Sequence, residues 1–414
     1  MADRILVIGA GAAGMMAAGE AALNGAEVTL LERNDRPGRK VMITGKGRCN
    51  VTNDCNELAE LISNVPVNGR FLYSAFSHFM PSDTVDFFES MGVMLKKERG
   101  NRVFPVSDKA VDIVDALHSF VTENGAEIVK GRAVKLLCED GRVIGAEDEN
   151  GTVYEAEKVI LATGGASYPQ TGSTGDGYKL AESVGHTIVE IKPSLVPLEC
   201  HEGFCTDLQG LSLRNVSIRV VDCYDGKEIY KDFGEMLFTH YGVSGPMILS
   251  ASSHIRNMQS ERYKIVIDLK PALTEEQLDA RILRDFSENV NRNFINALNS
   301  LLPKKLVPVI VRLSRIPMTT KVNQITREQR HGLVLLLKNF TVTVTDFRPV
   351  DEAIITSGGV CVKEINPRTM ESKLVKGLYF AGEIIDTDAY TGGFNLQIAF
   401  STGSLAGASA SAED

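Results

Sequence analysis

The chain has 414 residues, of which 43% are hydrophobic and 23% are charged, and its formal net charge at pH 7 is −9. This length predicts two or three domains, and the composition is that of an ordinary globular protein. The acidic balance argues against a nucleic-acid partner, because phosphate contacts require an excess of Lys and Arg. The sequence has no run of about 18 apolar residues, which argues against a transmembrane helix.

The start of the chain and its cysteines favour a cytoplasmic protein. An apolar, β-branched segment begins almost at once, so no secretory signal is expected before it. The seven cysteines are scattered, without a CxxC pair or the spacing of a zinc site. We therefore expect reduced thiols and no metal site.

The N-terminal segment predicts a βαβ unit. RILVIG, at 4–9, has the apolar, β-branched character of a buried parallel strand. GAGAAG at 9–14 follows, then a helix of small residues over 12–25 and a second strand over 26–32. This order of strand, glycine turn, helix and strand is the context that a dinucleotide-binding fingerprint requires.

The glycines and the acid of the fingerprint each have a physical role. Gly9 permits the tight turn, Gly11 lets a pyrophosphate approach the backbone, and Gly14 lets the helix pack closely on the strand. Glu32 lies 18 residues beyond the last glycine, where its carboxylate can accept hydrogen bonds from both ribose hydroxyls. Because its charge repels a 2′-phosphate, the site should hold FAD or NAD rather than NADP.

GRKVMITGKGRCNVTN, at 38–53, carries four positive charges and shows no helix or strand period. A long, basic, glycine-broken loop suits an extended FAD better than the regular βα unit that usually follows in an NAD dehydrogenase. Arg39, Lys40 or Arg48 can neutralise pyrophosphate or contact flavin carbonyl oxygens. The alternative is a basic loop that faces solvent.

The middle of the first half continues the α/β pattern. A helix is predicted from near Ser107 to Gly125, because apolar residues recur at helical spacing. VILATGG, at 159–165, predicts a buried strand that ends beside the fingerprint, and a glycine turn then leads into a helix over 173–185.

From about Lys192 the pattern changes to that of an inserted, mainly β region. Strands are predicted over 216–223, 263–269 and 340–347. Helices are predicted over 274–290, where Thr274 and Gln277 form a capping box, and over 327–339. We interpret 191–353 as an insertion: a β part, 191–270 and 315–353, that contains a helical subdomain, 271–314.

The last segment repeats the pattern of the first, in which a strand and a glycine turn precede a helix. KGLYFAGE, at 376–383, predicts a strand, and a Gly-Gly turn leads into a helix that begins near Asn395. The N-terminus of such a helix, aimed at a flavin pyrimidine ring, would stabilise negative charge there. We therefore expect one Rossmann-like α/β FAD-binding domain, built from 1–190 and 354–414.

Four long motifs carry a resemblance to a known family. They are GRKVMITGKGRCNVTN, ATGGASYPQTGSTGDG, LFTHYGVSGP and GLYFAGEIIDTDAYTGGFNLQIAFSTG. Together they resemble the BaiN/aminoacetone-oxidase-like family of NAD(P)/FAD-dependent oxidoreductases, over nearly the whole chain. The resemblance implies a glutathione-reductase-like FAD domain with an inserted β-barrel domain and a small helical domain.

The resemblance also implies FAD contacts at matching positions of this sequence. They are Ala13, Glu32, Arg33, Lys40, Gly47, Arg48, Cys49, Asn50, Asn53, Val134, Thr163, Gly164, Gly382, Glu383, Gly393, Asn395 and Leu396. A more distant likeness to fumarate-reductase-type flavoproteins lacks the Arg and His constellation of that active site, so reduction of C4-dicarboxylates is not expected.

Catalytic groups are harder to assign, because a flavin supplies the redox chemistry and the protein supplies placement. His240 and Tyr241, in FTHYG, are the candidate acid–base and hydrogen-bonding residues; the alternative is that both only cap or pack the inserted region. Cys49 is expected to be a packing residue or backbone contact rather than a redox thiol.

Three functions follow from these observations. The first is an FAD-dependent reductase or dehydrogenase of a small or alicyclic substrate, with NAD(P)H as a transient donor; bile-acid-type enone reduction is one activity the resemblance allows. The second is an oxygen-dependent oxidase of a small, aminoacetone-like amine that releases hydrogen peroxide. The third is a non-catalytic, redox-responsive flavoprotein. No membrane partner is expected, and the oligomeric state stays open.

Overall fold

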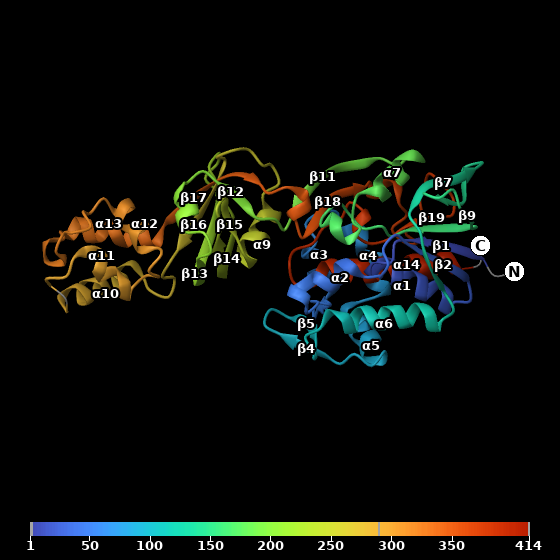
Figure 1. Ribbon diagram of the computed structural model, residues 1–414, viewed down its shortest axis with the longest axis horizontal. Coiled ribbons are helices and arrows are strands. Elements are labelled where there is room, and N and C mark those ends of the chain that lie inside the picture. Colours follow the sequence, from blue (N-terminus) through green and yellow to red (C-terminus); the bar gives the residue numbers. More distant parts are fainter. Residues whose placement is uncertain (1–2, 289, 413–414) are drawn as a thin grey trace. The chain divides into compact units, whose positions relative to one another are not determined.

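The computed structural model describes residues 3–288 and 290–412 and divides into two compact units. Unit 1 comprises Met1–Ser194 and Val350–Asp414, and unit 2 is Leu195–Pro349. In Figure 1 the blue beginning and the red end of the chain lie together in unit 1. The middle of the chain is thus inserted into a unit that both ends build.

A five-stranded parallel sheet forms the centre of unit 1, in the order β19-β10-β1-β2-β6. Its strands are β1 (Arg4–Ile8), β2 (Glu27–Glu32), β6 (Glu127–Lys130), β10 (Lys158–Leu161) and β19 (Leu378–Phe380). All four residues of β10 are buried, as expected of a parallel strand covered on both faces. The fold class is confirmed: a strand from the end of the chain completes the sheet that the first residues begin.

Two helices from opposite ends of the chain pack closely together on this sheet. They are α1 (Ala12–Leu23) and α14 (Phe394–Ser411). A Cβ atom at Gly403 would lie 2.4 Å from the carbonyl oxygen of Ala13, and one at Gly407 would lie 2.4 Å from that of Ala17. Glycines four residues apart therefore let the two helix backbones approach each other along one face.

The remaining elements of unit 1 surround this centre. The helices are α2 (Arg39–Ile43), α3 (Leu58–Ser63), α4 (Tyr73–His78), α5 (Pro81–Ser90), α6 (Ala110–Glu123) and α7 (Asp176–Ser183). The smaller sheets are antiparallel and contain β3 (Thr52–Asn53), β4 (Leu95–Glu98) and β5 (Arg102–Pro105); β7 (Ala133–Glu139), β8 (Arg142–Asp148) and β9 (Val153–Glu155); and β11 (Ile188–Ser194) with β18 (Ile355–Val360).

The expectation of an irregular segment over 38–53 is wrong in part. Helix α2 begins directly after Gly38, which adopts a positive φ of 69° and donates its N–H to the carbonyl oxygen of Ala10. The buried side chain of Val41 holds this short helix against the core. These are tertiary contacts, which a search for periodicity does not detect. Positive φ angles at Gly45 and Lys46 then end the regular structure, as the glycines predicted.

Unit 2 contains a closed barrel in the order β12-β15-β14-β13-β16-β17. The strands are β12 (Leu198–Cys200), β13 (Ser212–Asp222), β14 (Glu228–Phe238), β15 (Gly242–Ser244), β16 (Tyr263–Asp268) and β17 (Phe340–Phe347), with the helices α8 (Phe204–Asp207) and α9 (Pro246–His254) beside them. Alternate residues at the end of β13 are buried, which gives the barrel its apolar interior.

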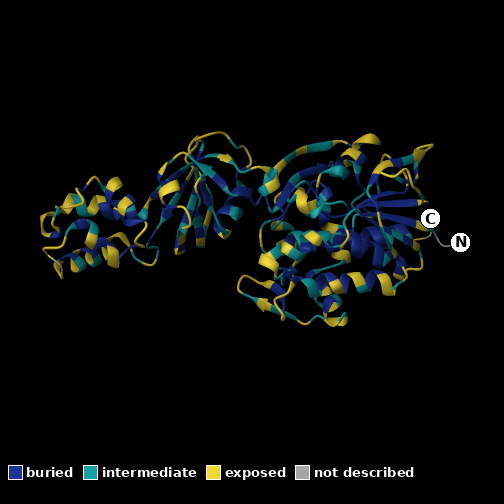
Figure 2. Cartoon of the chain, in the orientation of Figure 1, coloured by how far each residue is buried: buried dark blue, intermediate teal, exposed yellow. Residues whose placement is uncertain are grey.

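The helical part of unit 2 contains α10 (Glu275–Ser287), α11 (Phe294–Ala297), α12 (Val307–Ser314) and α13 (Arg327–Lys338). The capping box of Thr274 and Gln277 forms as predicted. Helix α13 packs against α10 and α12, so the helical cluster includes residues beyond 314. One buried cluster runs through barrel and helices, seen as the dark blue interior in Figure 2.

No helix in the described ranges combines the length and the apolar character that a membrane-spanning segment needs.

A substitution at the contact between α1 and α14 tests its role. Because a Cβ atom at Gly407 would press on the backbone of Ala17, Gly407→Ala should destabilise unit 1 by about 1–3 kcal/mol, the usual effect of overpacking. Urea unfolding of the purified chain measures this. Gly332→Ala is the matched control, because Gly332 lies in α13 and, apart from the helix itself, no described atom lies within 4 Å of the added Cβ. This change should be neutral or stabilise by up to about 1 kcal/mol. Equal stability of the two variants would contradict the packing argument.

Candidate functional site

Three parallel strands of unit 1 end in glycine turns at the same edge of the sheet. Gly9 follows β1 with φ +102°, Gly164 lies beyond β10 with φ +74°, and Gly382 lies beyond β19 with φ +76°. In open α/β sheets, ligands bind at the carboxyl ends of the strands. The structure therefore brings the predicted residues Gly9, Thr163–Gly164 and Gly382 to one such edge.

The three fingerprint glycines have different surroundings. A Cβ atom at Gly9 would lie 2.7 Å from the carbonyl oxygen of Ala162, and one at Gly14 would lie 1.8 Å from that of Gly9. These two positions are thus closed to larger residues by the protein itself. At Gly11, by contrast, no described atom lies within 4 Å of the Cβ position. Open space at the N-terminus of α1 is what a pyrophosphate requires.

Glu32, at the end of β2, has a fixed orientation. Its Oε2 accepts a hydrogen bond of 2.8 Å from the backbone N–H of Ala10, and its Oε1 accepts bonds of 2.8 and 2.7 Å from the backbone and side-chain nitrogens of Asn34. A carboxylate oxygen can accept a second bond, so the group keeps acceptor capacity for ribose hydroxyls. Asn34 was not predicted as a partner of Glu32.

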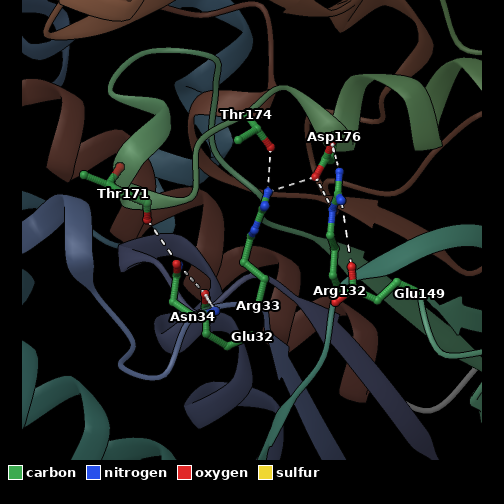
Figure 3. Close-up of polar contacts among 8 residues, drawn as sticks. All are labelled: Glu32, Arg33, Asn34, Arg132, Glu149, Thr171, Thr174 and Asp176. Atoms are coloured by element: carbon green, nitrogen blue, oxygen red, sulfur yellow. Dashed lines mark hydrogen bonds and ion pairs between the residues drawn. The ribbon is translucent and has the colours of Figure 1, made fainter.

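An ion-pair cluster surrounds the neighbouring Arg33 (Figure 3). Its Nη1 donates to Thr174 Oγ1 at 2.7 Å and to Asp176 Oδ2 at 3.0 Å, and Arg132 donates to both oxygens of Asp176 at 2.8 and 3.0 Å. Arg132, first, and also Arg33 and Thr174, hold the pKa of the Asp176 carboxyl below its usual value. The loop before α7 is therefore tied to the end of β2. Asp176 belongs to the motif ATGGASYPQTGSTGDG, but no role was predicted for it.

The basic segment does not present free positive charges in the way that we expected. Arg48 pairs with Glu98 and Asp108 and stacks over the Phe104 ring, with its Cζ 4.2 Å from the ring centroid. Arg39 donates to Asn34 Oδ1 at 3.0 Å. Because two carboxylates neutralise Arg48, its electrostatic attraction for a phosphate is reduced.

Lys40 takes part in a network at the strand ends. Its Nζ lies 2.6 Å from Glu383 Oε2 and donates to Ser167 Oγ at 2.6 Å. Glu383 Oε1 also accepts a bond of 2.8 Å from the backbone N–H of Thr356. The network joins the segments after β2, β10 and β19 to β18. Ser167 and Thr356 were missed, because residues so far apart in sequence carry no local signal of their contact.

The start of α14 is held by the short strand β3. A Cβ atom at Gly393, whose φ is +102°, would lie 2.4 Å from the carbonyl group of Thr52, and Asn53 Nδ2 donates to the carbonyl oxygen of Gly392 at 3.1 Å. The Asn395 side chain turns back, since it both donates to and accepts from the backbone of Ala389. Among described residues, Gln397 is the first in α14 whose N–H has a backbone acceptor. The N–H groups of the first turn, which includes Leu396, are thus available at this end.

Two buried polar atoms at the predicted site have no hydrogen-bond partner among the described residues. They are Asn50 Oδ1 and Thr163 Oγ1. An unpaired buried polar atom costs about 1–3 kcal/mol. Both residues were predicted to contact FAD, and a bound ligand with polar atoms would remove the cost. Together with the open space at Gly11, they show that the residues present fit an FAD.

Cys49 is completely buried and has a positive φ of 58°. Burial raises the pKa of its thiol to about 12, although a hydrogen bond with Thr44 acts in the opposite direction. The thiol is therefore neutral at physiological pH, which agrees with a packing role.

Two predicted FAD contacts are exposed, and the two catalytic candidates belong to unit 2. Val134 is exposed in β7, and Gly47 is exposed at the end of the turn that follows α2. His240 and Tyr241 belong to unit 2, between β14 and β15. There the His240 ring meets the Tyr241 ring edge to face, and Arg348 lies over the Tyr241 ring with its Cζ 4.5 Å from the centroid.

Known proteins match this chain over nearly its full length. A family model described as "HI0933-like protein Rossmann domain" matches residues 3–409. A 3-dehydro-bile acid delta(4,6)-reductase from Clostridium scindens is 32% identical, covering 99% of each chain. A ribosomal RNA dihydrouridine synthase from Escherichia coli is 31% identical over 96% of this chain and 95% of its own.

The fold also occurs in solved flavoenzyme structures. A 3-ketosteroid delta1-dehydrogenase from Sterolibacterium denitrificans, solved with 1,4-androstadiene-3,17-dione, has a TM-score of 0.51 at 12% identity and covers 99% of both chains. At this identity the similarity concerns the fold alone.

The sheet, the fingerprint and the strand-end turns define a Rossmann-type nucleotide-binding domain. The chain belongs to the HI0933-like family of FAD-binding oxidoreductases, as the resemblance of its motifs indicated.

Alkylation tests the state of Cys49. At pH 8 its neutral, buried thiol should resist iodoacetamide in the native protein, whereas the exposed Cys223 should be modified. Peptide mass spectrometry measures both sites in one sample, and unfolding in urea should remove the difference. Modification of Cys49 as fast as that of Cys223 in the native chain would contradict the assignment.

A double-mutant cycle tests the Lys40–Glu383 pair. Glu383→Gln leaves the half-buried Lys40 without its carboxylate, so we expect a loss of about 1–3 kcal/mol in unfolding free energy and weaker FAD retention. Lys40→Met in the same background should recover part of the stability, because no unpaired charge then remains. Additive effects of the two changes would show that the pair is not coupled.

Proposed function

We propose that this protein is an FAD-dependent reductase that saturates a carbon–carbon double bond conjugated to a ring carbonyl, with NAD(P)H as electron donor. The observation that carries the proposal is the full-length similarity to two relatives whose names describe this bond change. A 3-dehydro-bile acid delta(4,6)-reductase and a dihydrouridine synthase act on different molecules, but both names describe reduction of a ring double bond.

The chemistry common to both names limits the substrate class. A 3-oxo group in conjugation with ring double bonds, and the uracil ring, each place an electron-poor carbon β to a carbonyl. Reduction adds a hydride at this carbon and a proton at the α-carbon. After the hydride has been added and before the proton arrives, the carbonyl oxygen carries negative charge. A site for this reaction needs a hydride source, a hydrogen-bond donor to the carbonyl and a proton donor.

We assign the cofactor to the strand ends of unit 1, where a bound flavin supplies the hydride chemistry. Gly11 leaves room for the pyrophosphate, and Glu32 accepts hydrogen bonds from the ribose. Asn50 and Thr163 gain partners for their buried oxygens. The network of Lys40, Ser167, Thr356 and Glu383 fixes the turns on which these groups lie.

We assign to His240 and Tyr241 the roles of forming hydrogen bonds to the substrate and donating a proton to it. The imidazole and the phenol can both donate a proton, and the guanidinium of Arg348 lies against the Tyr241 ring.

Anaerobic flavin spectroscopy tests the proposal. NADH or NADPH should bleach the flavin band of the purified protein, and addition of a 3-oxo-4,6-diene steroid, 2-cyclohexenone or a uridine-containing RNA should restore it in at least one case. Tyr241→Phe should slow the restoration at least about tenfold without slowing the bleaching, because a general acid typically contributes 10²–10⁴-fold.

Tyr224→Phe is the matched control, because Tyr224 is an exposed tyrosine elsewhere in unit 2. If neither nucleotide reduces the flavin and aminoacetone releases hydrogen peroxide from aerated protein, the protein is an oxidase. If neither the nucleotides nor any amine reduces it, a non-catalytic flavoprotein is indicated.

A further inference from the structure

The positive charge of this acidic chain is concentrated in one segment of the helical part of unit 2. Residues 290–327 contain no Asp or Glu and seven Lys or Arg residues. Since the whole chain has a net charge of −9, the remainder carries −16 (−9 less +7). The whole-chain charge, which argued against a nucleic-acid partner, therefore averages over two regions of opposite sign.

Four of these residues are held in one continuous strip of structure. The segment 292–295 lies alongside the segment 318–322. The N–H of Phe294 donates to Thr320 O at 2.8 Å, and the N–H of Val322 donates to Arg292 O at 3.1 Å. Helix α12 leads into this pair of segments. We define the basic strip as Arg292, Arg312, Arg315 and Lys321, all of which are exposed.

The charges of the basic strip are largely uncompensated. Within the described residues, no carboxylate lies within ion-pair distance of Arg292, Arg315 or Lys321. The acceptor of Lys321 in the described part of the chain is an amide oxygen, Asn293 Oδ1, at 2.8 Å. Arg312 pairs with Asp207 at 3.0 Å, but both groups are exposed, and such pairs contribute little and exchange readily with other anions.

An apolar groove lies beside Arg312 and Arg315. It has a volume of about 390 Å³, and its walls come from Ile295, Val311, Ile316 and Met318, with Arg312 and Arg315 beside them. Apolar walls flanked by guanidinium groups suit a flat, partly apolar ring that is linked to phosphates. Nucleobases in single-stranded RNA have this character, because bases stack on apolar or guanidinium surfaces while the backbone follows positive charge.

We propose that the basic strip binds the phosphodiester backbone of single-stranded RNA and that the adjoining groove receives a base. The proposal deepens the proposed function and rests on it, since uracil is one of the conjugated rings that such a reductase can accept. RNA is favoured over an acidic protein because a base can pack on the apolar walls while the phosphates contact the guanidinium groups beside them.

Salt-dependent RNA binding tests this surface. The FAD-loaded full chain should bind a fluorescein-labelled, U-rich RNA of about 20 nucleotides, measured by anisotropy. The variant Arg292→Gln/Arg315→Gln/Lys321→Gln should bind at least about tenfold more weakly. The slope of log Kd against log salt concentration should fall by about 2, since each lost phosphate contact in a single strand contributes about 0.7.

The matched control is Lys135→Gln/Lys179→Gln/Lys264→Gln, which removes the same charge from exposed positions elsewhere. The control should keep the wild-type Kd and slope, and both variants should keep their FAD and their rate of reduction by NAD(P)H. Absence of RNA binding by the wild-type chain at about 150 mM salt, or an equal loss in the control, would overturn the proposal. So would equally tight, strip-dependent binding to phosphatidylserine vesicles. Intact RNA binding without any reduction of conjugated substrates would instead overturn the proposed reaction.

Discussion

The structure of unit 1 depends on the close packing of α1 against α14. Two glycines of α14 lie against the carbonyl oxygens of Ala13 and Ala17, at a distance that leaves no space for a side chain. This contact joins the first and last parts of the chain, and β19 joins the same sheet beside β10. Since loop-closure entropy grows only slowly with length, the long insertion between them costs little.

The packing of the two chain ends against each other also creates the edge of the sheet to which we assign the cofactor. The turns after β1, β10 and β19 come from widely separated parts of the sequence, and each needs a glycine with positive φ. The Lys40–Glu383 pair connects the segment after β2 to the segment after β19, and Glu32 is bonded to the first turn through Ala10. Charges near the edge are therefore paired within the protein, which fixes the positions of the backbone groups that meet the FAD.

Much of unit 1 could be predicted from the sequence, because its signals are local. The glycine spacing, the β-branched strand at 4–9 and the acid at Glu32 each follow from a short segment, as does the capping box at Thr274 in unit 2. Helix α2 could not be predicted, because the burial of Val41 stabilises it. The partners of Arg33, Lys40 and Arg48 were also hidden, since each ion pair joins residues at least 50 positions apart.

Hydrogen exchange measured by mass spectrometry, with and without FAD, tests the central claim most directly. If both ends of the chain hold one FAD, its binding should slow amide exchange together in peptides that contain 9–15, 163–165 and 393–397. Protection confined to the first of these peptides, or a purified chain that takes up no flavin, would contradict the account.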